Sequence, residues 1–598
     1  MGTPLAPGGR EAGPRPRIAR DPVPRSEGRS GPAPRIARVL PDLPLDKVFD
    51  YRIPDHLSDQ VRVGTMVRVP LHGRRIGGWV VGLADEAATD RPLQQLAKVT
   101  GWGPPADVVR LARWAAWRWA GRPAQLLGTA SPPRAVRGLP PRPAEPAVPA
   151  GDLREGVTVV RVPPAADNLP LALSVAARGD ALILSPSLAA AGYLAARLRQ
   201  DGLRVALVPQ DWAQAAAGGC VAVGARAGAW APRPRLGAVL VVDEGDEGYQ
   251  EERAPTWNAR DVAVERARRA GVPCVLASPC PSLEALAYGP LTVPSRAEER
   301  RGWPVLDVVD RRQDPPGSGL YSSRLVALAR EAEPDARLVC VLNRKGRGRL
   351  LACATCRELA RCEPCGAAVE AADEGLRCRR CRTERPTVCL ACGATRLATL
   401  RVGVTRAREE LELLANRPVA EVTADTAPGP PPADVPILVG TEAVLHRVSG
   451  ARAVAFLDFD QELLAPRYRA AEAAIGMLAR AARLIGGRSG SGRLLVQTRV
   501  PGHEVIDAAL HADPSRLTVV ESARRAALRF PPETAVAAVS GQAAAAFVDA
   551  LDGSVEVLGP ANDRWLLRAP DHRTLCDALA AAARPPGRLR IEVDPLRV

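Results

Sequence analysis

Lysine is almost absent from this 598-residue sequence and occurs only at Lys47, Lys98 and Lys345. Each lysine is followed by Val or Gly, and none stands in the GxxxxGK[ST] pattern that places a lysine on nucleotide phosphates. The ordinary phosphate-binding loop is therefore excluded. Because Lys and Arg together number 81 against 66 Asp and Glu, the formal net charge is +15 and nearly every cation is an arginine. This excess favours a polyanionic partner such as nucleic acid.

Long apolar runs are also missing. No stretch of about 18 apolar residues occurs, and the arginine-rich first residues lack the apolar core of a secretory signal. We therefore expect no membrane association and a cytoplasmic location. Apolar residues make up 46% and charged residues 25%, values that exclude wholesale disorder and a collagen-like fibre. A chain of this length should fold into several units.

Changes in composition divide the chain. Apolar runs of four to six residues alternate with Ala/Leu/Arg-rich helical stretches after the first quarter of the sequence, which is typical of parallel sheets with helices on both faces. Short strand-like runs precede this region, and a separate α+β unit follows it. The predicted segments are a disordered basic arm (1–35), a β domain (36–100), a helical segment with a Pro-rich linker (101–156), a first α/β lobe (157–292), a second lobe (293–520) with a cysteine-rich insertion (350–395), and a C-terminal domain (521–598).

Four CxxC pairs are the strongest chemical signal. Two CxxC turns supply the four thiolates of a closed tetrahedral zinc site, so eight cysteines predict two structural zinc ions with no open coordination position. Iron–sulfur ligation and dithiol redox chemistry are less favoured alternatives. The remaining five of the 13 cysteines are scattered among apolar neighbours. The pairs are Cys353/Cys356, Cys362/Cys365, Cys378/Cys381 and Cys389/Cys392.

Arginines lie between the cysteine pairs and predict a basic rim. Such a rim is either a solvated surface or a contact for DNA or a partner protein, and the sequence leaves both readings open. These residues are Arg357, Arg361, Arg377, Arg379, Arg380 and Arg382.

The order of several motifs resembles the family of bacterial primosomal protein N-prime, the PriA replication restart proteins. The resemblance covers the chain from about residue 36 to its end. It rests on FDY at 49–51, VRVP at 67–70, a glycine-containing strand at 77–81, NRKG at 343–346, the eight cysteines, and VDP at 593–595. It implies a β-rich DNA-binding domain, two RecA-like parallel-sheet lobes of the superfamily 2 helicase fold, an inserted double zinc-binding module and a C-terminal α+β domain.

The resemblance also implies residue roles. Members of the family bind abandoned or stalled forks, recognise the 3′ end of the nascent strand, and rebuild the primosome with its partner proteins so that the replicative helicase is reloaded. By resemblance, Phe49 would stack on the terminal base, Asp50 would accept a hydrogen bond from the 3′-hydroxyl, and Gly64 would allow close backbone approach. Tyr51 and Lys98 would belong to the same 3′-end-binding pocket. The outer cysteines (Cys353, Cys356, Cys389, Cys392) would bind one zinc and the inner four (Cys362, Cys365, Cys378, Cys381) the other.

The nucleotide-binding motifs of the family are degraded. The segment 159–173, where the family has its phosphate loop, contains Pro163 and Pro164, which lack amide donors. Asp243 and Glu244 remain of the family's DEEH box, but Gly245 and Asp246 replace its second half. The motifs SATPSLE, GTQM and QVAGRAGR are altered at 278–284, 440–443 and 482–489. Asp243 and Glu244 are predicted to be relics of the nucleotide site, or alternatively residues that orient a lobe interface.

We therefore expect a helicase-fold protein without helicase activity, whose binding of ATP and Mg²⁺ is doubtful. It would bind forked and single-stranded DNA, primosome proteins and the replicative helicase, with single-stranded DNA-binding protein as a further partner. Two alternatives stay open: an active ATP-dependent 3′ to 5′ DNA helicase with a divergent nucleotide site, and a zinc-ribbon nucleic-acid binder without fork specificity. A second reading of Phe49 and Tyr51 is that they belong to a β-sheet core.

Overall fold

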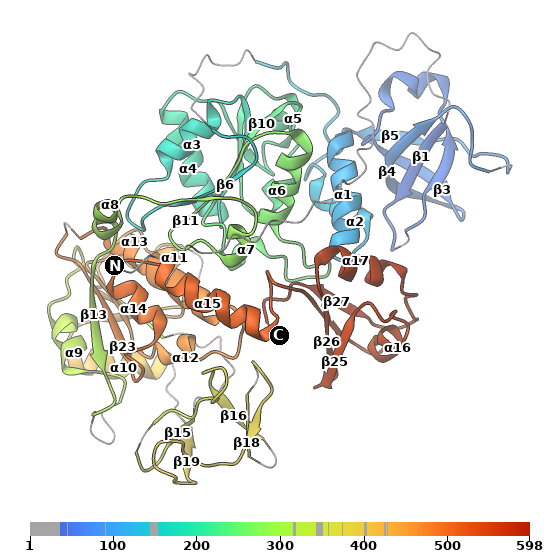
Figure 1. The fold of residues 1–598 in the computed structure, drawn as a ribbon. Coiled ribbons are helices and arrows are strands. Elements are labelled where there is room, and N and C mark those ends of the chain that lie inside the picture. Colours follow the sequence, from blue (N-terminus) through green and yellow to red (C-terminus); the bar gives the residue numbers. More distant parts are fainter. Residues whose placement is uncertain are drawn as a thin grey trace, which may run out of the picture.

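The computed structural model describes residues 36–597 except 45, 90, 144–152, 315–318, 343–350, 357, 373–374, 379, 400–403, 424–425, 427–428 and 489. The basic arm at 1–35, the motif at 343–346, Arg357 and Arg379 lie outside the described residues. Figure 1 shows an N-terminal β domain, two α/β lobes, a cysteine-rich module and a C-terminal domain. The predicted multidomain α/β fold class is thereby confirmed. Within the described residues, no helix is long and apolar enough to cross a membrane.

The N-terminal domain is a five-stranded antiparallel sheet with the order β2-β1-β4-β3-β5. Residues alternate along β3, where Val67 and Val69 are buried and Arg68 is exposed, as expected for a half-buried strand. Residues 94–97, directly before the edge strand β5, form backbone hydrogen bonds both with Arg52 on the opposite edge strand β2 and with Arg68 on β3. The elements are β1 (Ile36–Pro41), β2 (Phe49–Arg52), η1 (Asp55–Gln60), β3 (Met66–Leu71), β4 (Arg74–Ala84) and β5 (Lys98–Gly101).

Two helices, α1 (Ala106–Arg118) and α2 (Pro123–Ala130), join this sheet to the rest of the molecule. Trp79 on β4 donates a hydrogen bond from Nε1 to Ser131 Oγ at 2.8 Å, just beyond α2. The same apolar core contains Trp79, Trp119 after α1, Trp230 of the first lobe and Phe547 of the C-terminal domain. The two helices therefore pack with the β domain and the first lobe at the same time.

The first lobe, lobe 1, has a seven-stranded parallel sheet with the order β12-β6-β11-β10-β7-β9-β8. Strands β7 and β11 are buried along their whole length, because helices cover both faces, and they accordingly appear in the sequence as continuous apolar runs. The strands are β6 (Val157–Arg161), β7 (Asp180–Leu184), β8 (Val205–Val208), β9 (Val221–Gly224), β10 (Leu236–Val242), β11 (Cys274–Ser278) and β12 (Leu291–Thr292). The helices are α3 (Leu169–Ala176), α4 (Leu188–Gln200), α5 (Trp212–Ala217), η2 (Arg226–Trp230), η3 (Glu247–Tyr249), α6 (Ala259–Ala270) and α7 (Leu283–Leu286).

The second lobe, lobe 2, has a six-stranded parallel sheet with the order β13-β23-β22-β14-β21-β20. The domain boundary that we placed after residue 520 falls inside α15, which packs against α13 and α14. The strands are β13 (Val305–Asp310), β14 (Leu338–Val341), β20 (Val419–Val422), β21 (Ile437–Gly440), β22 (Ala453–Phe456) and β23 (Arg493–Thr498). The helices are α8 (Arg296–Gly302), α9 (Ser323–Arg330), α10 (Val404–Ala415), α11 (Ala443–Arg447), α12 (Asp460–Leu463), α13 (Ala470–Ile485), α14 (Glu504–Leu510) and α15 (Ser515–Leu528).

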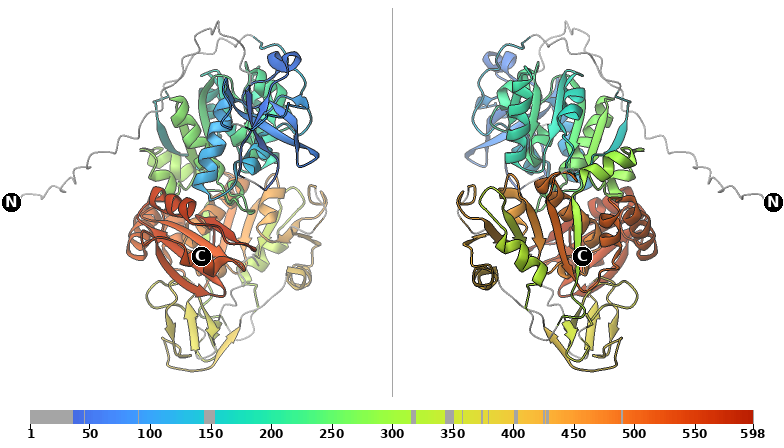
Figure 2. Two further views of the ribbon diagram at one scale, coloured as in Figure 1. Left: turned by 90° about the vertical axis from the view of Figure 1, so that its right-hand side faces the viewer. Right: turned by 90° about the vertical axis from the view of Figure 1, so that its left-hand side faces the viewer.

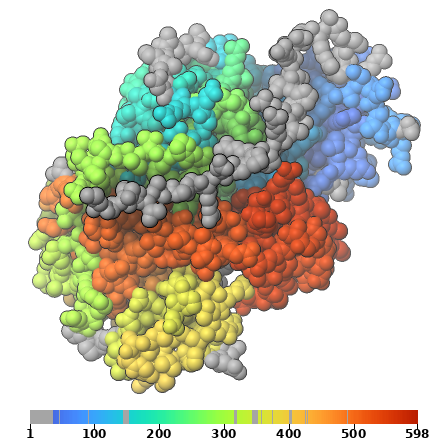
Figure 3. All heavy atoms as spheres, in the orientation of Figure 1, coloured from blue at the N-terminus to red at the C-terminus, as the bar shows by residue number. Residues whose placement is uncertain are grey.

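The cysteine-rich module projects from lobe 2, on the far side from lobe 1 in both views of Figure 2. Its strands are short and form two small antiparallel sheets. They are β15 (Leu351–Cys353), β16 (Val369–Ala372), β17 (Gly375–Cys378), β18 (Glu384–Arg385) and β19 (Leu397–Thr399). In Figure 3 the module lies directly beneath the surface formed by lobe 2.

The C-terminal domain is an antiparallel sheet with the order β25-β26-β24-β27. It returns to the N-terminal half of the chain, where Asp594 pairs with Arg118 of α1 at 2.6 Å and Thr256 Oγ1 donates to Val593 O at 3.3 Å. Both partners of the Arg118–Asp594 pair are buried. The elements are β24 (Ala535–Ser540), α16 (Ala544–Asp549), β25 (Glu556–Ala561), β26 (Arg564–Ala569), α17 (His572–Ala581) and β27 (Arg590–Val593).

Candidate metal centres, DNA-end pocket and interlobe cleft

The eight CxxC cysteines come together as two groups of four. In each group all sulfur atoms lie within 4.8 Å of one another. The closest Sγ–Sγ distances are 3.3 to 3.5 Å, against about 3.8 Å for the edge of a tetrahedron with zinc–sulfur bonds of about 2.3 Å. The outer group is Cys353, Cys356, Cys389 and Cys392, and the inner group is Cys362, Cys365, Cys378 and Cys381. Both groups could hold a metal ion.

The thiols of the inner group perturb one another. A hydrogen bond from Cys365 lowers the pKa of Cys378 to about 5, and the same contact together with burial raises the pKa of Cys365. One thiolate is therefore stabilised by keeping its neighbour protonated. All four thiols can be ionised together only when a cation lies between them. Four thiolates arranged as a tetrahedron are the ligands that zinc has in structural sites.

The predicted basic rim is only partly exposed. Arg377 on β17 is about half exposed and pairs with Glu384. Arg380, between Cys378 and Cys381, is instead buried, with 8% of its surface exposed. Its guanidinium donates to the carbonyls of Cys365, Ala465 and Arg467. The rim prediction is therefore wrong for Arg380, because this side chain turns into the contact with lobe 2.

The FDY residues of the expected DNA-end pocket lie on β2. Tyr51 is buried, donates a hydrogen bond to Pro70 O at 3.1 Å and has its pKa raised by burial. Phe49 is partly buried against the same apolar cluster, with Lys47 Nζ 5.4 Å from its ring centroid. Both side chains thus contact the core of the β domain. Phe49 keeps some exposed surface, but Tyr51 is a core residue.

Asp50 points to the other face of β2. Its Oδ2 accepts a hydrogen bond from Ala88 N at 2.8 Å, and its Oδ1 lies 3.9 Å from Arg38 Nε. Its side chain is only 7% exposed. A carboxylate has about four lone-pair positions, so Asp50 can accept a further hydroxyl proton, provided that the residues around it move aside.

The other two residues expected in the pocket, Lys98 and Gly64, have different surroundings. Lys98 is exposed at the start of β5, opposite Arg68 and directly after the segment that bonds to β2. Gly64 has φ = +95°, and a Cβ at this position would lie 1.8 Å from Pro104 O. The packing of Pro104 is sufficient to require glycine here, whether or not DNA approaches.

In the loop after β6, residues 163–166 have no backbone amide available to bind a phosphate group. Pro163 and Pro164 lack N–H groups, Ala165 N donates to Gly302 O at 3.1 Å, and Ala166 N donates to Pro163 O at 2.9 Å. Gly302 approaches so closely that a Cβ on it would lie 2.3 Å from Pro163 Cβ. Every amide from 163 to 166 is therefore either missing or already bonded.

Glu244 is occupied within lobe 1. Its Oε1 accepts from Ser282 N at 2.8 Å, and its Oε2 accepts from Ser282 Oγ at 2.8 Å and from Arg260 at 3.1 Å. The residue is 1% exposed. These three donors anchor the start of α7, where Ser282 is the N-cap. Glu244 thus has a structural role in this conformation and offers no open position to Mg²⁺.

Asp243 faces lobe 2. Both of its carboxylate oxygens contact Arg483 of α13, at 2.6 and 2.7 Å. Burial raises the pKa of Asp243, but the charge and hydrogen bonds of Arg483 outweigh burial and hold that pKa below its ordinary value. Asp243 therefore lies at the contact between the two lobes, where our second reading places it.

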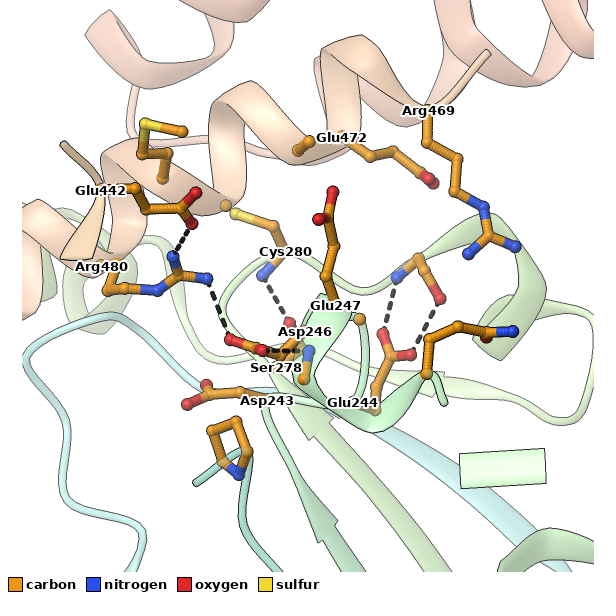
Figure 4. Close-up of a pocket in the computed structure, with 18 of the residues that line it drawn as sticks. Asp243, Glu244, Asp246, Glu247, Ser278, Cys280, Glu442, Arg469, Glu472 and Arg480 are labelled. Atoms are coloured by element: carbon orange, nitrogen blue, oxygen red, sulfur yellow. Dashed lines mark hydrogen bonds and ion pairs between the residues drawn. The ribbon is translucent and has the colours of Figure 1, made fainter. Parts of the chain in front are cut away.

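Three further carboxylates of lobe 1 form ion pairs with arginines from the opposite side of the cleft. Arg480 bridges Asp246 at 2.9 Å and Glu442 of its own lobe, as Figure 4 shows. The other contacts are Glu247–Arg467 at 3.2 Å, Glu284–Arg469 at 2.7 Å and Glu284–Arg525 at 3.1 Å. Together with Asp243–Arg483, we call these the interlobe ion pairs. In each of them lobe 1 supplies the carboxylate and the lobe 2 side supplies the guanidinium.

The interlobe ion pairs surround a cavity of about 610 Å³. Its lining mixes the carboxylates of Asp243, Glu244 and Glu472 with the guanidiniums of Arg480 and Arg483. A triphosphate needs a predominantly cationic site. In this cleft these arginines are instead paired with carboxylates, so their positive charge is already neutralised.

The N-terminal region is similar to a known DNA-binding domain. Residues 38–132 match the family model described as the 3′ DNA-binding domain (3′BD) of PriA. The match extends past β5 through α1 and α2, in keeping with the packing of Trp79 against Ser131.

Full-length relatives extend the similarity. The chain is 27% identical over 605 residues to a probable replication restart protein PriA of Mycobacterium tuberculosis (strain ATCC 25618 / H37Rv), with 91% of this chain and 90% of the relative covered. It is also 27% identical to replication restart protein PriA of Bacillus subtilis (strain 168), covering 56% and 47%. A solved structure of S. cerevisiae Dbp5 bound to RNA and ADP BeF3 has 10% identity, covers 62% of this chain and 89% of its own, and has a TM-score of 0.35.

The molecule is thus a two-lobed α/β protein with an N-terminal region that matches a 3′ DNA-binding domain and with two tetracysteine groups that could hold metal ions. Over most of its length the chain is similar to replication restart proteins PriA, and its N-terminal region matches the model of the PriA 3′ DNA-binding domain.

Sequence reasoning missed the arginine partners in the cleft. Arg483 lies 240 positions from Asp243, and Arg480 lies 234 positions from Asp246. Two features of the sequence hinted at this contact. The lysine of the phosphate-binding loop is missing, and an arginine-containing segment lies near the position of the family's QVAGRAGR motif. These features indicate a changed site but do not identify the ion pairs.

Proposed function

We propose that this protein is a replication restart factor that binds abandoned or stalled forks at a 3′ DNA end and promotes primosome assembly and reloading of the replicative helicase, without hydrolysing ATP. The 3′ DNA-binding domain matched at 38–132 and the net charge of +15 support DNA binding. The tetracysteine module is proposed to hold two structural zinc ions and to face partner proteins. We expect the protein to be associated with the nucleoid, with single-stranded DNA-binding protein as a further partner.

The proposal that the protein does not hydrolyse ATP is supported by the region where relatives bind the phosphates. The loop at 163–166 has no amide available for a phosphate group, and the lysine that would neutralise the phosphate charge is missing from the sequence. Asp243 and Glu244, which would hold Mg²⁺ in an active relative, are bonded to Arg483, Arg260 and Ser282. Nucleotide binding in the usual orientation would require breaking these contacts.

Steady-state ATP hydrolysis tests this proposal. The purified full-length protein is assayed with and without a forked DNA carrying a free 3′ end, in a preparation whose fork binding is measured in parallel. We expect no fork-stimulated turnover and no fluorescence change with a labelled ATP analogue. Fork-stimulated turnover would show that the protein is an active helicase with a divergent nucleotide site.

Recognition of the DNA end is tested through Asp50. Forks that end in a 3′-hydroxyl or a 3′-phosphate are compared for the wild type, Asp50→Asn and the exposed control Asp55→Asn. We expect the wild type and the control to prefer the hydroxyl and Asp50→Asn to lose that preference. Equal loss of affinity for both ends in Asp50→Asn would argue against the pocket assignment.

Salt dependence tests the electrostatic part of binding. Arginine–phosphate contacts release counterions, so fork affinity should fall steeply between about 50 and 200 mM salt. A fork should also bind more tightly than single-stranded DNA of the same length. Equal affinity for both would favour a zinc-ribbon nucleic-acid binder without fork specificity.

A further inference from the structure

Residues 464–469, here called the junction segment, lie between α12 and α13 and contact two distant parts of the molecule. The backbone carbonyls of Ala465 and Arg467 accept hydrogen bonds from Arg380 of the inner metal group, at 3.2 and 3.1 Å. The carbonyl of Leu464 accepts from Ala368 N at 2.7 Å. The cysteine-rich module thus bonds to the main chain of the junction segment.

The side chains of the same segment reach lobe 1. Arg467 contacts Glu247 at 3.2 Å, and Arg469 contacts Glu284 at 2.7 Å. Tyr468, between them, is buried and stacks on Phe530 with ring centroids 5.1 Å apart. One short segment therefore accepts main-chain hydrogen bonds from the metal module and supplies two of the interlobe ion pairs.

Arg380 is the side chain on which this connection depends. It lies inside the CxxC turn formed by Cys378 and Cys381, and its Nη1 donates to Cys365 O at 3.1 Å within the same metal group. All three of the carbonyls it contacts are therefore held by one planar guanidinium. Because the CxxC turns are organised by the metal that their thiolates bind, the direction of Arg380 depends on metal occupancy.

We propose that Arg380 is a positioning residue that couples metal occupancy of the inner cysteine group to the contact between the two lobes, through the junction segment. With metal bound, Arg380 holds the main chain at 465 and 467, and Arg467 and Arg469 meet the carboxylates of lobe 1. When the metal is removed, the CxxC turn relaxes, the junction segment loses its donor, and lobe 1 is released near Glu247 and Glu284. This coupling is independent of whether the protein hydrolyses ATP.

Hydrogen exchange of the full-length protein, read by mass spectrometry, tests the coupling. The readouts are exchange in the junction segment and in η3 of lobe 1, together with the zinc content. On chelation of the wild type, we expect exchange at both places to become about tenfold faster, which corresponds to about 1.4 kcal/mol. Increased exchange in the cysteine-rich module alone, with η3 unchanged, would overturn the proposal.

Variants distinguish the coupling through Arg380 and the junction segment from a general loss of structure. Arg380→Met should keep two zinc ions per chain yet show the faster exchange without chelation, whereas Arg377→Met, a half-exposed arginine of the same module, should behave as the wild type. Arg467→Met removes the contact between the junction segment and lobe 1, so exchange in η3 should become faster while exchange in the cysteine-rich module stays unchanged. If Arg467→Met leaves η3 protected, or if Arg380→Met retains zinc and wild-type exchange, the coupling does not exist.

Discussion

Arg525 is the most deeply buried cation of the interlobe contact, and replacing it with methionine is the sharpest test of that contact. It is 1% exposed, and its guanidinium contacts Glu284 of α7 at 3.1 Å, Glu521 of α15 at 3.1 Å, and Glu472 of α13. Arg525→Met keeps an unbranched apolar stem but removes every donor. Three carboxylates would then lose a shared partner.

The magnitude follows from burial. Removing one partner from a buried ion pair costs about 3–5 kcal/mol, because the other charge stays buried without compensation. Burial raises the pKa of Glu284, but Arg469 and Arg525 outweigh it and lower that pKa to about 2, so Glu284 is charged at neutral pH. Since Arg469 would still contact Glu284 at 2.7 Å in the variant, we expect a loss of about 3 kcal/mol, the lower end of the range.

The assay must be local, because a chain with several domains does not unfold in one step. Hydrogen exchange of α7 in the full-length protein reports the contact directly, and about 3 kcal/mol predicts exchange roughly 100-fold faster. Arg524→Met is the matched control, since Arg524 is 23% exposed and forms its ion pairs with Glu504 and Glu521, which both lie on the lobe 2 side. Unchanged exchange of α7 in Arg525→Met would refute the view that this arginine holds the lobes together.

Three further predictions concern other parts of the molecule. Gly64→Ala should destabilise the β domain by about 1–3 kcal/mol in thermal unfolding without DNA, because its backbone is left-handed and Pro104 O fills the space of a Cβ; an unchanged melting temperature would contradict this. Burial lowers the pKa of His503 to about 4, so the unfolded chain binds an extra proton between pH 6.5 and 4 and stability falls by up to about 3 kcal/mol as the pH drops through that window. His503→Gln should remove this acid sensitivity, and the exposed His511→Gln should keep it. Chelation should release two zinc ions per chain and the structure of the module with them; a module that keeps its circular dichroism without metal would argue against structural zinc.

The sequence was most informative where chemistry is local. The four CxxC pairs identify ligands within single turns, and continuous apolar runs such as 181–184 predict buried parallel strands, because burial on both faces leaves no polar positions. The interlobe contact could not be predicted in this way. Arg483 and Asp243 meet only after two separate sheets have folded and packed, and no periodicity connects positions 240 residues apart.

Individual residues show the same limit. Gly64 fits the family motif, but the structure shows that it packs against Pro104, a contact that no spacing reveals. Arg380 is one of several arginines that we expected to form an exposed rim, yet it is buried, because lobe 2 presents the carbonyls of Ala465 and Arg467 to it. Burial of a charged side chain depends on what the fold places opposite it, and composition does not record that.

The pair between Arg118 and Asp594 has a consequence for how the protein is made. These residues are 476 positions apart, and the buried contact joins the segment after the N-terminal sheet to the last strand. During synthesis Arg118 must remain without this partner until Asp594 has left the ribosome, while lobe 1 has time to fold on its own. Nascent chains that stop before β27 should therefore expose the α1 surface to chaperones and proteases until β27 completes the C-terminal sheet.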